Sequence, residues 1–239
     1  MRKKLKFFLS VNWIKTIYFN FKKFPFSIAR KLPVYFYGDV KLTCITGAIK
    51  IDAPIKRAMI GFGQAYEKTT RSKGIAEFFV TGTLRFKGHA QFGKDCFLYV
   101  SNQGYCEFGH MASMASNGKI FCYNSVILGD WARIGSESQL IDTNFHQMKN
   151  TETGESYPMT GKIHLGDYNF VSNRVTILQK TKTPAYCTIA SNTLCSKDYS
   201  DLGSNIMIGG IPAKLLKENI SRDWEGERQI IEAALIISK

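Results

Sequence analysis

Apolar or nearly apolar residues recur at every sixth position over long stretches of this chain. The clearest series comprises Leu165, Val171, Ile177, Thr183, Ile189 and Cys195. Earlier series comprise Val80, Phe86, Phe92 and Leu98, then Phe108, Met114 and Ile120, then Leu128, Ile134 and Leu140. A helix repeats about every 3.6 residues and an ordinary strand alternates, so neither requires this period. A parallel β-helix does, because each hexad forms one side of a coil and stacked coils bury one residue per hexad. The pattern therefore predicts an all-β solenoid.

The hexads divide the chain into three regions. We expect a basic amphipathic N-terminal segment over residues 1–40, a hexapeptide-repeat domain over 41–217, and a C-terminal helix within 218–239. Ser221 is expected to open that helix, because serine is a favourable N-cap residue. Its predicted buried stripe comprises Trp224, Ile231, Ala234 and Leu235.

The six-residue pattern stops over residues 143–162, a polar stretch that ends in Gly161. Leu140 and Leu165 lie 25 positions apart. This spacing predicts an excursion loop that replaces about three sides of the coil. Long loops in compact folds are usually functional, so the excursion loop is the first place to look for chemistry.

The formal net charge is +13 at pH 7, and the N-terminus is strongly basic. Residues 1–38 contain many aromatic side chains, no acidic side chain and nine basic ones: Arg2, Lys3, Lys4, Lys6, Lys15, Lys22, Lys23, Arg30 and Lys31. This composition predicts a segment that lies on an anionic membrane surface, packs as a cap on the β-helix, or does both. The apolar run over residues 7–14 is short and lacks a small-residue cleavage site, unlike a signal peptide. We expect a cytoplasmic protein with peripheral contact at the inner face of the membrane.

Two partner classes are not expected from the sequence. The basic segment is not joined to a nucleic-acid-reading motif, so nucleic acid is not an expected partner. The six cysteines show no C-x-x-C spacing, so no zinc site is expected. Cys122 and Cys195 fall at or near inward positions, and we interpret them as small core residues of a reducing compartment.

Three features follow one another in the second half of the chain: D-T-N-F-H at 142–146, the in-register hexads, then S-K-D-Y at 196–199 and G-G-I-P-A-K at 209–214. Over residues 80–217 the chain thereby resembles the hexapeptide-repeat acyltransferases. Residues 10–36 also resemble the N-terminal segment of the subgroup that acetylates capsular or lipopolysaccharide sugars. The resemblance implies a left-handed parallel β-helix with helical extensions at both ends. It also implies a homotrimer with active sites between neighbouring chains.

The resemblance implies transfer of an acetyl group from acetyl-CoA to a sugar hydroxyl of a polysaccharide or lipid-linked saccharide. Such a reaction needs a base for the hydroxyl proton, and histidine suits that role because its ordinary pKa lies near neutrality. His146 lies in the family's catalytic motif. His89, His110 and His164 have no motif and are interpreted as structural, with His164 at an edge of the coil.

Two further residues of the motif have candidate roles. Asp142 either orients the imidazole of His146 or satisfies backbone N–H groups in a turn. Relatives often carry D-x-D-F-H, and this chain has Asn144 at the second acidic place. Asn144 is therefore predicted to orient the substrate or the loop.

The acyl carrier is expected along the coils that follow the excursion loop. The resemblance places backbone groups of Ser172, Asn173 and Ser191 beside the pantetheine arm, with the Asn173 N–H as the oxyanion donor. Lys197 and Lys214 match positions that approach the phosphates of CoA.

Two alternative functions remain beside this prediction, and a third is disfavoured by the spacing of the histidines. The same scaffold supports an N-acyltransferase that acts on an amino sugar, and a non-catalytic β-helix that binds or scaffolds a partner. A γ-type carbonic anhydrase needs a close H-x-x-x-x-H pair. Successive histidines here stand 21, 36 and 18 residues apart, so that pair is absent from the sequence.

Overall fold

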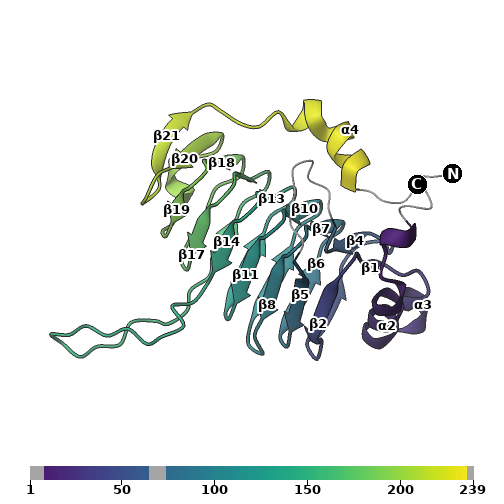
Figure 1. The fold of residues 1–239 in the computed structure, drawn as a ribbon. Helices are drawn as coiled ribbons and strands as arrows, with labels where there is room; N and C mark the ends of the chain where they lie inside the picture. The colour runs from purple at the N-terminus through teal and green to yellow at the C-terminus, as the bar shows by residue number, and fades with distance from the viewer. Residues whose placement is uncertain (1–7, 65–73, 236–239) are drawn as a thin grey trace.

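The computed structural model of the protein describes residues 8–64 and 74–235. Strands stack into an elongated three-sided coil (Figure 1). Up to β17 (Thr176–Leu178), consecutive strands enter three different sheets in turn, so that the fourth strand returns to the first sheet; beyond β17 the described strands belong to only two of the sheets. Each strand thus pairs with its counterpart in the next coil. Pairing among the described strands is parallel except between the last two.

The three sheets are named here by their number of strands. The nine-stranded sheet contains β1 (Val34–Phe36), β4 (Ile60–Phe62), β7 (Ala90–Phe92), β10 (Ala112–Met114), β13 (Arg133–Ile134), β16 (Phe170–Val171), β18 (Cys187–Ile189), β20 (Ile206–Gly209) and β21 (Lys214–Glu218). The seven-stranded sheet contains β2 (Val40–Cys44), β5 (Ala76–Val80), β8 (Phe97–Val100), β11 (Lys119–Cys122), β14 (Gln139–Ile141), β17 (Thr176–Leu178) and β19 (Leu194–Cys195). The five-stranded sheet contains β3 (Ala48–Ile51), β6 (Thr83–Phe86), β9 (Tyr105–Phe108), β12 (Ser125–Leu128) and β15 (Ile163–Leu165).

The core is the interior of the coil, and it is built from the hexad residues. Every residue of the predicted six-residue series is at most 3% exposed. The one polar member, Thr183, donates its hydroxyl to the side-chain oxygen of Asn169, so burial leaves no unpaired hydroxyl there. The prediction that hexads point inward is therefore confirmed at each position.

The excursion loop is an insertion at one corner. Gln139 of β14 pairs with Thr176 of β17, 37 positions further on, whereas Phe170 of β16 pairs with Thr188, 18 positions further on. The strands on either side of the loop, β14 and β15, occupy consecutive sides of the same coil. The prediction that the loop replaces sides of the coil is wrong, because the coil keeps all three sides and the loop adds residues between two of them.

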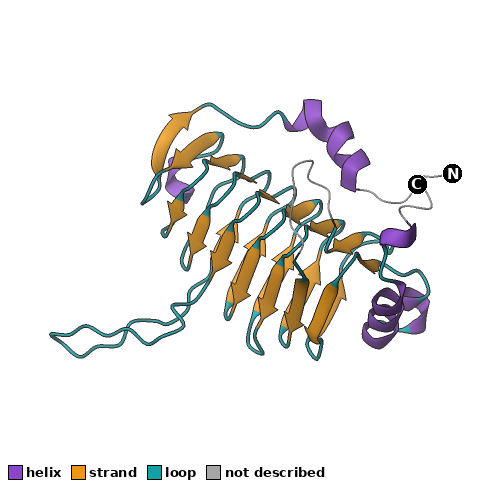
Figure 2. Cartoon of the chain, in the orientation of Figure 1, coloured by secondary structure: helices purple, strands orange, loops and turns teal. Residues whose placement is uncertain are grey.

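Helices cover the N-terminal end of the coil (Figure 2). Helix α2 (Trp13–Lys23) and the short α3 (Phe26–Ala29) precede the first strand. Phe19 of α2 meets Phe36 and Phe78 edge to face, with ring centroids 5.0 and 5.5 Å apart. Phe19 thereby covers the first aromatic layer of the core at the N-terminal end of the β-helix. The packing cap expected of this segment is present.

The C-terminal end is closed differently. Strand β21 turns back and pairs antiparallel with β20, which covers the last parallel edge. A 3₁₀ turn at Ser200–Leu202 precedes these strands. The chain then crosses back as helix α4 (Trp224–Leu235), in yellow in Figure 1. No helix in the described part of the chain is both long and apolar enough to cross a membrane.

Helix α4 begins later than predicted. Asp223 is its cap, because the Asp223 side chain accepts a hydrogen bond from the Gly226 N–H at 2.9 Å. Trp224 and Ile231 are buried as expected. The predicted burial of Ala234 and Leu235 concerns side chains that the structure does not describe.

The six cysteines differ sharply in exposure, which predicts their reactivity. Five are buried and Cys44 is partly exposed. Burial raises the pKa of Cys187 and of Cys195 to about 12, whereas hydrogen bonding to Thr46 lowers the pKa of Cys44. Because the thiolate is the reactive form, we expect Ellman's reagent to modify Cys44 quickly in the native protein and the others only after unfolding. The Cys44→Ser variant should lose the fast phase, and a fast phase that survives in it would contradict this assignment.

Candidate functional site

The excursion loop forms an antiparallel ribbon that projects from the coil, here called the arm (residues 143–162; Figure 1). Its two sides are joined by backbone hydrogen bonds from Asn144 to Met159, from Tyr157 to Met148 and from Asn150 to Glu155. A turn closes the tip, where Gly154 has a φ of +73°. Ribbon pairing gives a polar insertion a defined shape, so its residues are held at fixed distances from the coil.

Asp142 anchors the base of the arm. Its side chain is fully buried and accepts hydrogen bonds from the backbone N–H groups of Tyr123 and Asn124 at 2.7 and 2.8 Å. Burial raises the pKa of Asp142 above its ordinary value, and these N–H groups partly offset that effect. The carboxylate thereby ties the start of the arm to the corner of the preceding coil.

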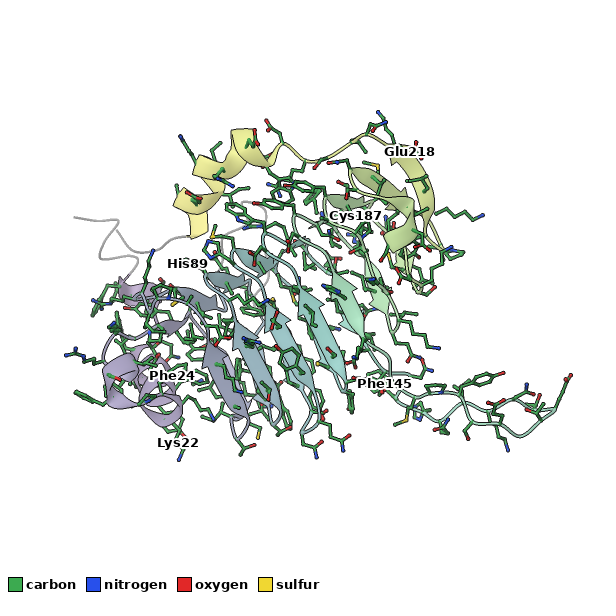
Figure 3. The ribbon with its side chains drawn as sticks, turned by 180° about the vertical axis from the view of Figure 1, so that it is seen from behind. Lys22, Phe24, His89, Phe145, Cys187 and Glu218 are labelled. Carbon is green, nitrogen blue, oxygen red and sulfur yellow. The ribbon has the colours of Figure 1, made fainter. Side chains whose placement is uncertain are left out.

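An aromatic ladder positions the residue before His146. Phe79, Tyr99 and Tyr123 stack on the outer face of the seven-stranded sheet, with centroids 4.8 and 5.2 Å apart. Phe145, labelled in Figure 3, adds its ring edge-on to Tyr123, with ring centroids 5.8 Å apart. With Phe145 held in this way, the exposed His146 is presented to solvent at the base of the arm. Asn144 is also exposed.

A groove of about 670 Å³ lies below the arm, on the corner between the seven- and five-stranded sheets, here called edge II. Its lining consists of Phe79, Thr81, Tyr99, Ser101, Asn102, Gln103, Tyr123, Asn124, Met159 and Thr160. A hydrogen bond to Tyr99 and burial raise the pKa of Tyr123 to about 12, so its hydroxyl is neutral at pH 7. The groove therefore combines ring edges with hydroxyl and amide groups that both donate and accept hydrogen bonds.

The corner at edge II is narrow because glycines stack there. A Cβ on Gly82 would lie 2.1 Å from the carbonyl oxygen of Ser101, and one on Gly104 would lie 2.4 Å from that of Cys122. Only glycine permits so close an approach of successive coils. We infer that the floor of the groove is set by backbone packing.

A second, smaller cleft lies on the corner between the nine- and seven-stranded sheets, here called edge I. Its volume is about 280 Å³, and its lining consists of Arg174, Thr176, Asn192, Thr193, Leu194 and Ile211. The Arg174 guanidinium forms an ion pair with Glu137 at 2.8 Å. The side chain of Asn173 accepts a hydrogen bond from the backbone N–H of Ser136, so it holds adjacent coils together.

The predicted carrier-binding residues are divided between the two edges. Ser172, Asn173 and Ser191 follow strands β16 and β18, at edge I. Lys214 opens β21 beside Gly209, at the C-terminal end of the same edge. Lys197 follows β19 of the seven-stranded sheet and therefore lies on edge II. The arm with His146 also leaves from edge II.

The remaining histidines occupy other places. His89 and His110 lie on the corner before the nine-stranded sheet, with ring centroids 5.7 Å apart, and burial lowers the pKa of His89. His164 is the exposed middle residue of β15, so its predicted place at an edge of the coil is wrong. Within residues 8–64 and 74–235, no group of three or more His, Cys, Asp or Glu side chains is arranged to hold a metal ion.

Sequence reasoning did not find the groove under the arm. Tyr99, Tyr123, Asn102 and Gln103 belong to no motif. The available signal was the placement of aromatic residues at outward positions in successive coils, next to inward hexad residues. Arg174 and Asn192 of edge I were also missed, because single polar residues at coil corners resemble ordinary turn residues.

No protein-family model matches the chain, and no curated protein sequence matches it. Among solved structures, the polySia-specific acetyltransferase NeuO is 14% identical, with a TM-score of 0.49 over 80% of this chain and 78% of that one. The polysialic acid O-acetyltransferase OatWY is 18% identical, with a TM-score of 0.39 over 79% and 89%. AntD, an N-acyltransferase from Bacillus cereus in complex with dTDP and 3-hydroxybutyryl-CoA, is 12% identical, with a TM-score of 0.48 over 84% and 87%. Because these similarities are low, function is inferred below from the residues of this chain.

Proposed function

We propose that this protein is an acetyl-CoA-dependent O-acetyltransferase that acts on a sugar hydroxyl, with His146 as the general base. The observation that carries the proposal is the presentation of His146. The D-T-N-F-H motif is anchored by the Asp142 carboxylate, which accepts from the backbone N–H groups of Tyr123 and Asn124, and by the Phe145 ring, which packs edge-on against Tyr123. His146 is thereby exposed on a structured arm that borders a polar groove.

In the proposed reaction, a ring nitrogen of His146 accepts the proton of the acceptor hydroxyl. The hydroxyl oxygen attacks the thioester carbonyl of acetyl-CoA and forms a tetrahedral oxyanion. Collapse of that intermediate breaks the C–S bond, and the protonated imidazole returns its proton to the departing thiolate. The backbone N–H of Asn173 is the proposed oxyanion donor, which adds stabilisation where charge develops. Asp142 and Asn144 act as positioning residues of the arm.

We infer that the complete site forms between two copies of the chain in a homotrimer. His146 projects from edge II, whereas Ser172, Asn173, Ser191 and Lys214 lie on edge I. These are two different corners of the three-sided β-helix. An arm from one chain that reaches edge I of its neighbour brings base and carrier together. The arm is suited to such contact, since Met148 and Tyr157 expose about half of their side chains. The left-handed winding implied by the resemblance belongs to the same proposal.

The basic residues of edge I are suited to binding the phosphates of a CoA molecule. Arg174, which is ion-paired with Glu137, lines the cleft, and Lys214 lies beside Gly209 on the same edge, where its ammonium group is a candidate partner for the phosphates of CoA. The pantetheine arm would follow the corner past Ser172 and Ser191, where backbone groups of successive coils are available. Lys197 would reach the carrier only from another copy, because it lies on edge II.

The groove of edge II fits a saccharide acceptor. Its amide groups at Asn102, Gln103 and Asn124 both donate and accept, as a ring of sugar hydroxyls requires. Its volume of about 670 Å³ lies within the range typical of ligand sites. Because Met159 and Thr160 of the arm line the groove, an acceptor bound there would lie near the base of the arm that carries His146.

The first test of the proposal is binding of acetyl-CoA to the full-length protein by calorimetry, with ATP as a control ligand. We expect saturable binding of acetyl-CoA with about one site per chain. The Lys214→Ala variant should bind more weakly because it loses a phosphate partner. The Lys50→Ala variant, which removes an exposed lysine of β3 in the five-stranded sheet, is the matched control and should bind normally. Absence of binding would refute the carrier assignment and favour the scaffold alternative.

A further inference from the structure

We propose that the N-terminal helices bind the surface of an anionic lipid bilayer through an exposed apolar patch. This patch, called here the α2 outer face, consists of Ile14, Ile17, Tyr18, Phe21 and Phe26. Their exposed fractions run from 48% for Ile17 and Phe21 to 84% for Ile14. Large side chains this exposed on one helix indicate an interaction surface.

The α2 outer face is continuous. Residues 14, 17, 18 and 21 follow the spacing that places side chains on one side of a helix. Phe26 extends the patch onto α3, and its ring centroid lies 6.1 Å from that of Phe21. The patch therefore joins two helices at the end of the coil.

The opposite side of α2 is fixed to the coil by polar bonds. Asn20 donates to the Val34 carbonyl at 2.7 Å and accepts from the Val34 N–H at 3.2 Å. The Thr16 hydroxyl oxygen accepts from the Phe36 N–H at 3.1 Å. Rotation of the helix to bury the α2 outer face would break these bonds and expose Phe19, which is 1% exposed. The patch thus faces outward in the folded chain.

Charge identifies the partner as an anionic surface. Residues 1–38 contain no acidic side chain. Lys22, Arg30 and Lys31 are exposed near the patch, whereas Lys23 donates inward to the Ile45 carbonyl at 2.9 Å. Rings at headgroup depth flanked by cations are the pattern of an interfacial helix on anionic lipid. A second copy of the same face would bring like charges together, which opposes self-association there.

The position of the patch is compatible with catalysis at the two edges. Helices α2 and α3 lie at one end of the coil, and β21 lies at the other (Figure 1). In Figure 3, Lys22 and Glu218 mark these opposite ends. Docking through α2 leaves edge I and edge II free, so a membrane-bound chain still reaches an acceptor. This inference does not depend on the proposed acetyl transfer.

The test is cosedimentation of the full-length protein with lipid vesicles. One vesicle set is phosphatidylcholine alone, and the other contains about 30% phosphatidylglycerol as the anionic component. We expect binding to the anionic vesicles to be at least about tenfold stronger than to the neutral ones and to weaken as salt is raised.

Two variants distinguish binding through the α2 outer face from binding through exposed apolar side chains elsewhere. The triple variant Ile14→Gln, Ile17→Gln, Phe21→Gln keeps helix-forming residues and should bind anionic vesicles at least about tenfold more weakly. The control Ile75→Gln, Ile230→Gln removes two other exposed apolar side chains and should bind normally. Circular dichroism and thermal melting establish that both variants are folded.

Three results would overturn the proposal. The first is equal binding to both vesicle sets, and the second is unchanged binding of the folded triple variant. The third is a smaller oligomer for the triple variant by light scattering without any change in vesicle binding, which would assign the face to contact between copies.

Discussion

Replacing His146 by alanine is expected to lower the rate of acetyl transfer by about 10²–10⁴-fold, the usual contribution of a general base. The imidazole is the proposed proton acceptor, and the exposed carbonyl and amide groups of the arm are too weakly basic to replace it. Because His146 is exposed and makes no core contact, the variant should fold and melt like the parent protein. Acetyl-CoA should bind the variant with unchanged affinity, since the proposed carrier site lies on edge I and its cleft is not lined by His146.

The measurement is acetyl transfer to a panel of saccharides with free hydroxyl or amino groups, followed by mass spectrometry. The acceptor with the highest rate in the parent protein is then used for the variants. His164→Ala is the matched control, because His164 is an exposed histidine on the outer face of β15 and should retain full activity. Transfer at the parent rate by His146→Ala would refute the base assignment. Preference for amino acceptors would move the reaction to N-acylation.

The fold was predictable because one number, the six-residue period, determines both which residues are buried and how strands pair. Leu165, Val171 and Ile177 read as successive sides of one coil in sequence, and the structure buries each of them fully. Which face of α2 packs against the coil was not predictable in the same way. Its orientation depends on hydrogen bonds of Thr16 and Asn20 to backbone of β1, and these polar residues have no apolar periodicity to reveal them.

The candidate site was predictable only where a motif marked it. His146 was singled out through its neighbours in sequence, and its role as the base stays a prediction, whereas Asp142 was singled out with two roles open. The hydrogen bonds of its carboxylate to Tyr123 and Asn124 depend on a contact between coils that sequence spacing does not contain. The same holds for the groove of edge II, whose lining comes from three successive coils and the arm. To predict a surface that spans several coils, one must know the register between those coils. The arm and the longer N-terminal coils make that register irregular in the sequence.

Coexpression of two inactive variants is expected to restore activity if the site forms between chains. One variant is His146→Ala, which lacks the base on edge II. The other is Ser191→Trp, whose indole would fill the edge I cleft from an exposed position and block the carrier. Each variant alone should be inactive, and each should form the same oligomer as the parent protein.

Coexpression of the two variants gives mixed trimers in which His146 of one chain meets the open cleft of its neighbour. Random assembly at equal expression leaves one intact site in each mixed trimer, so about a quarter of the parent activity should return. Separately purified variants mixed without subunit exchange are the control and should stay inactive. If edges I and II of one chain formed the site, coexpression would also leave the protein inactive, because no chain would carry both an intact base and an open cleft. Recovery therefore tests the separation of the two edges directly, independently of the acceptor sugar.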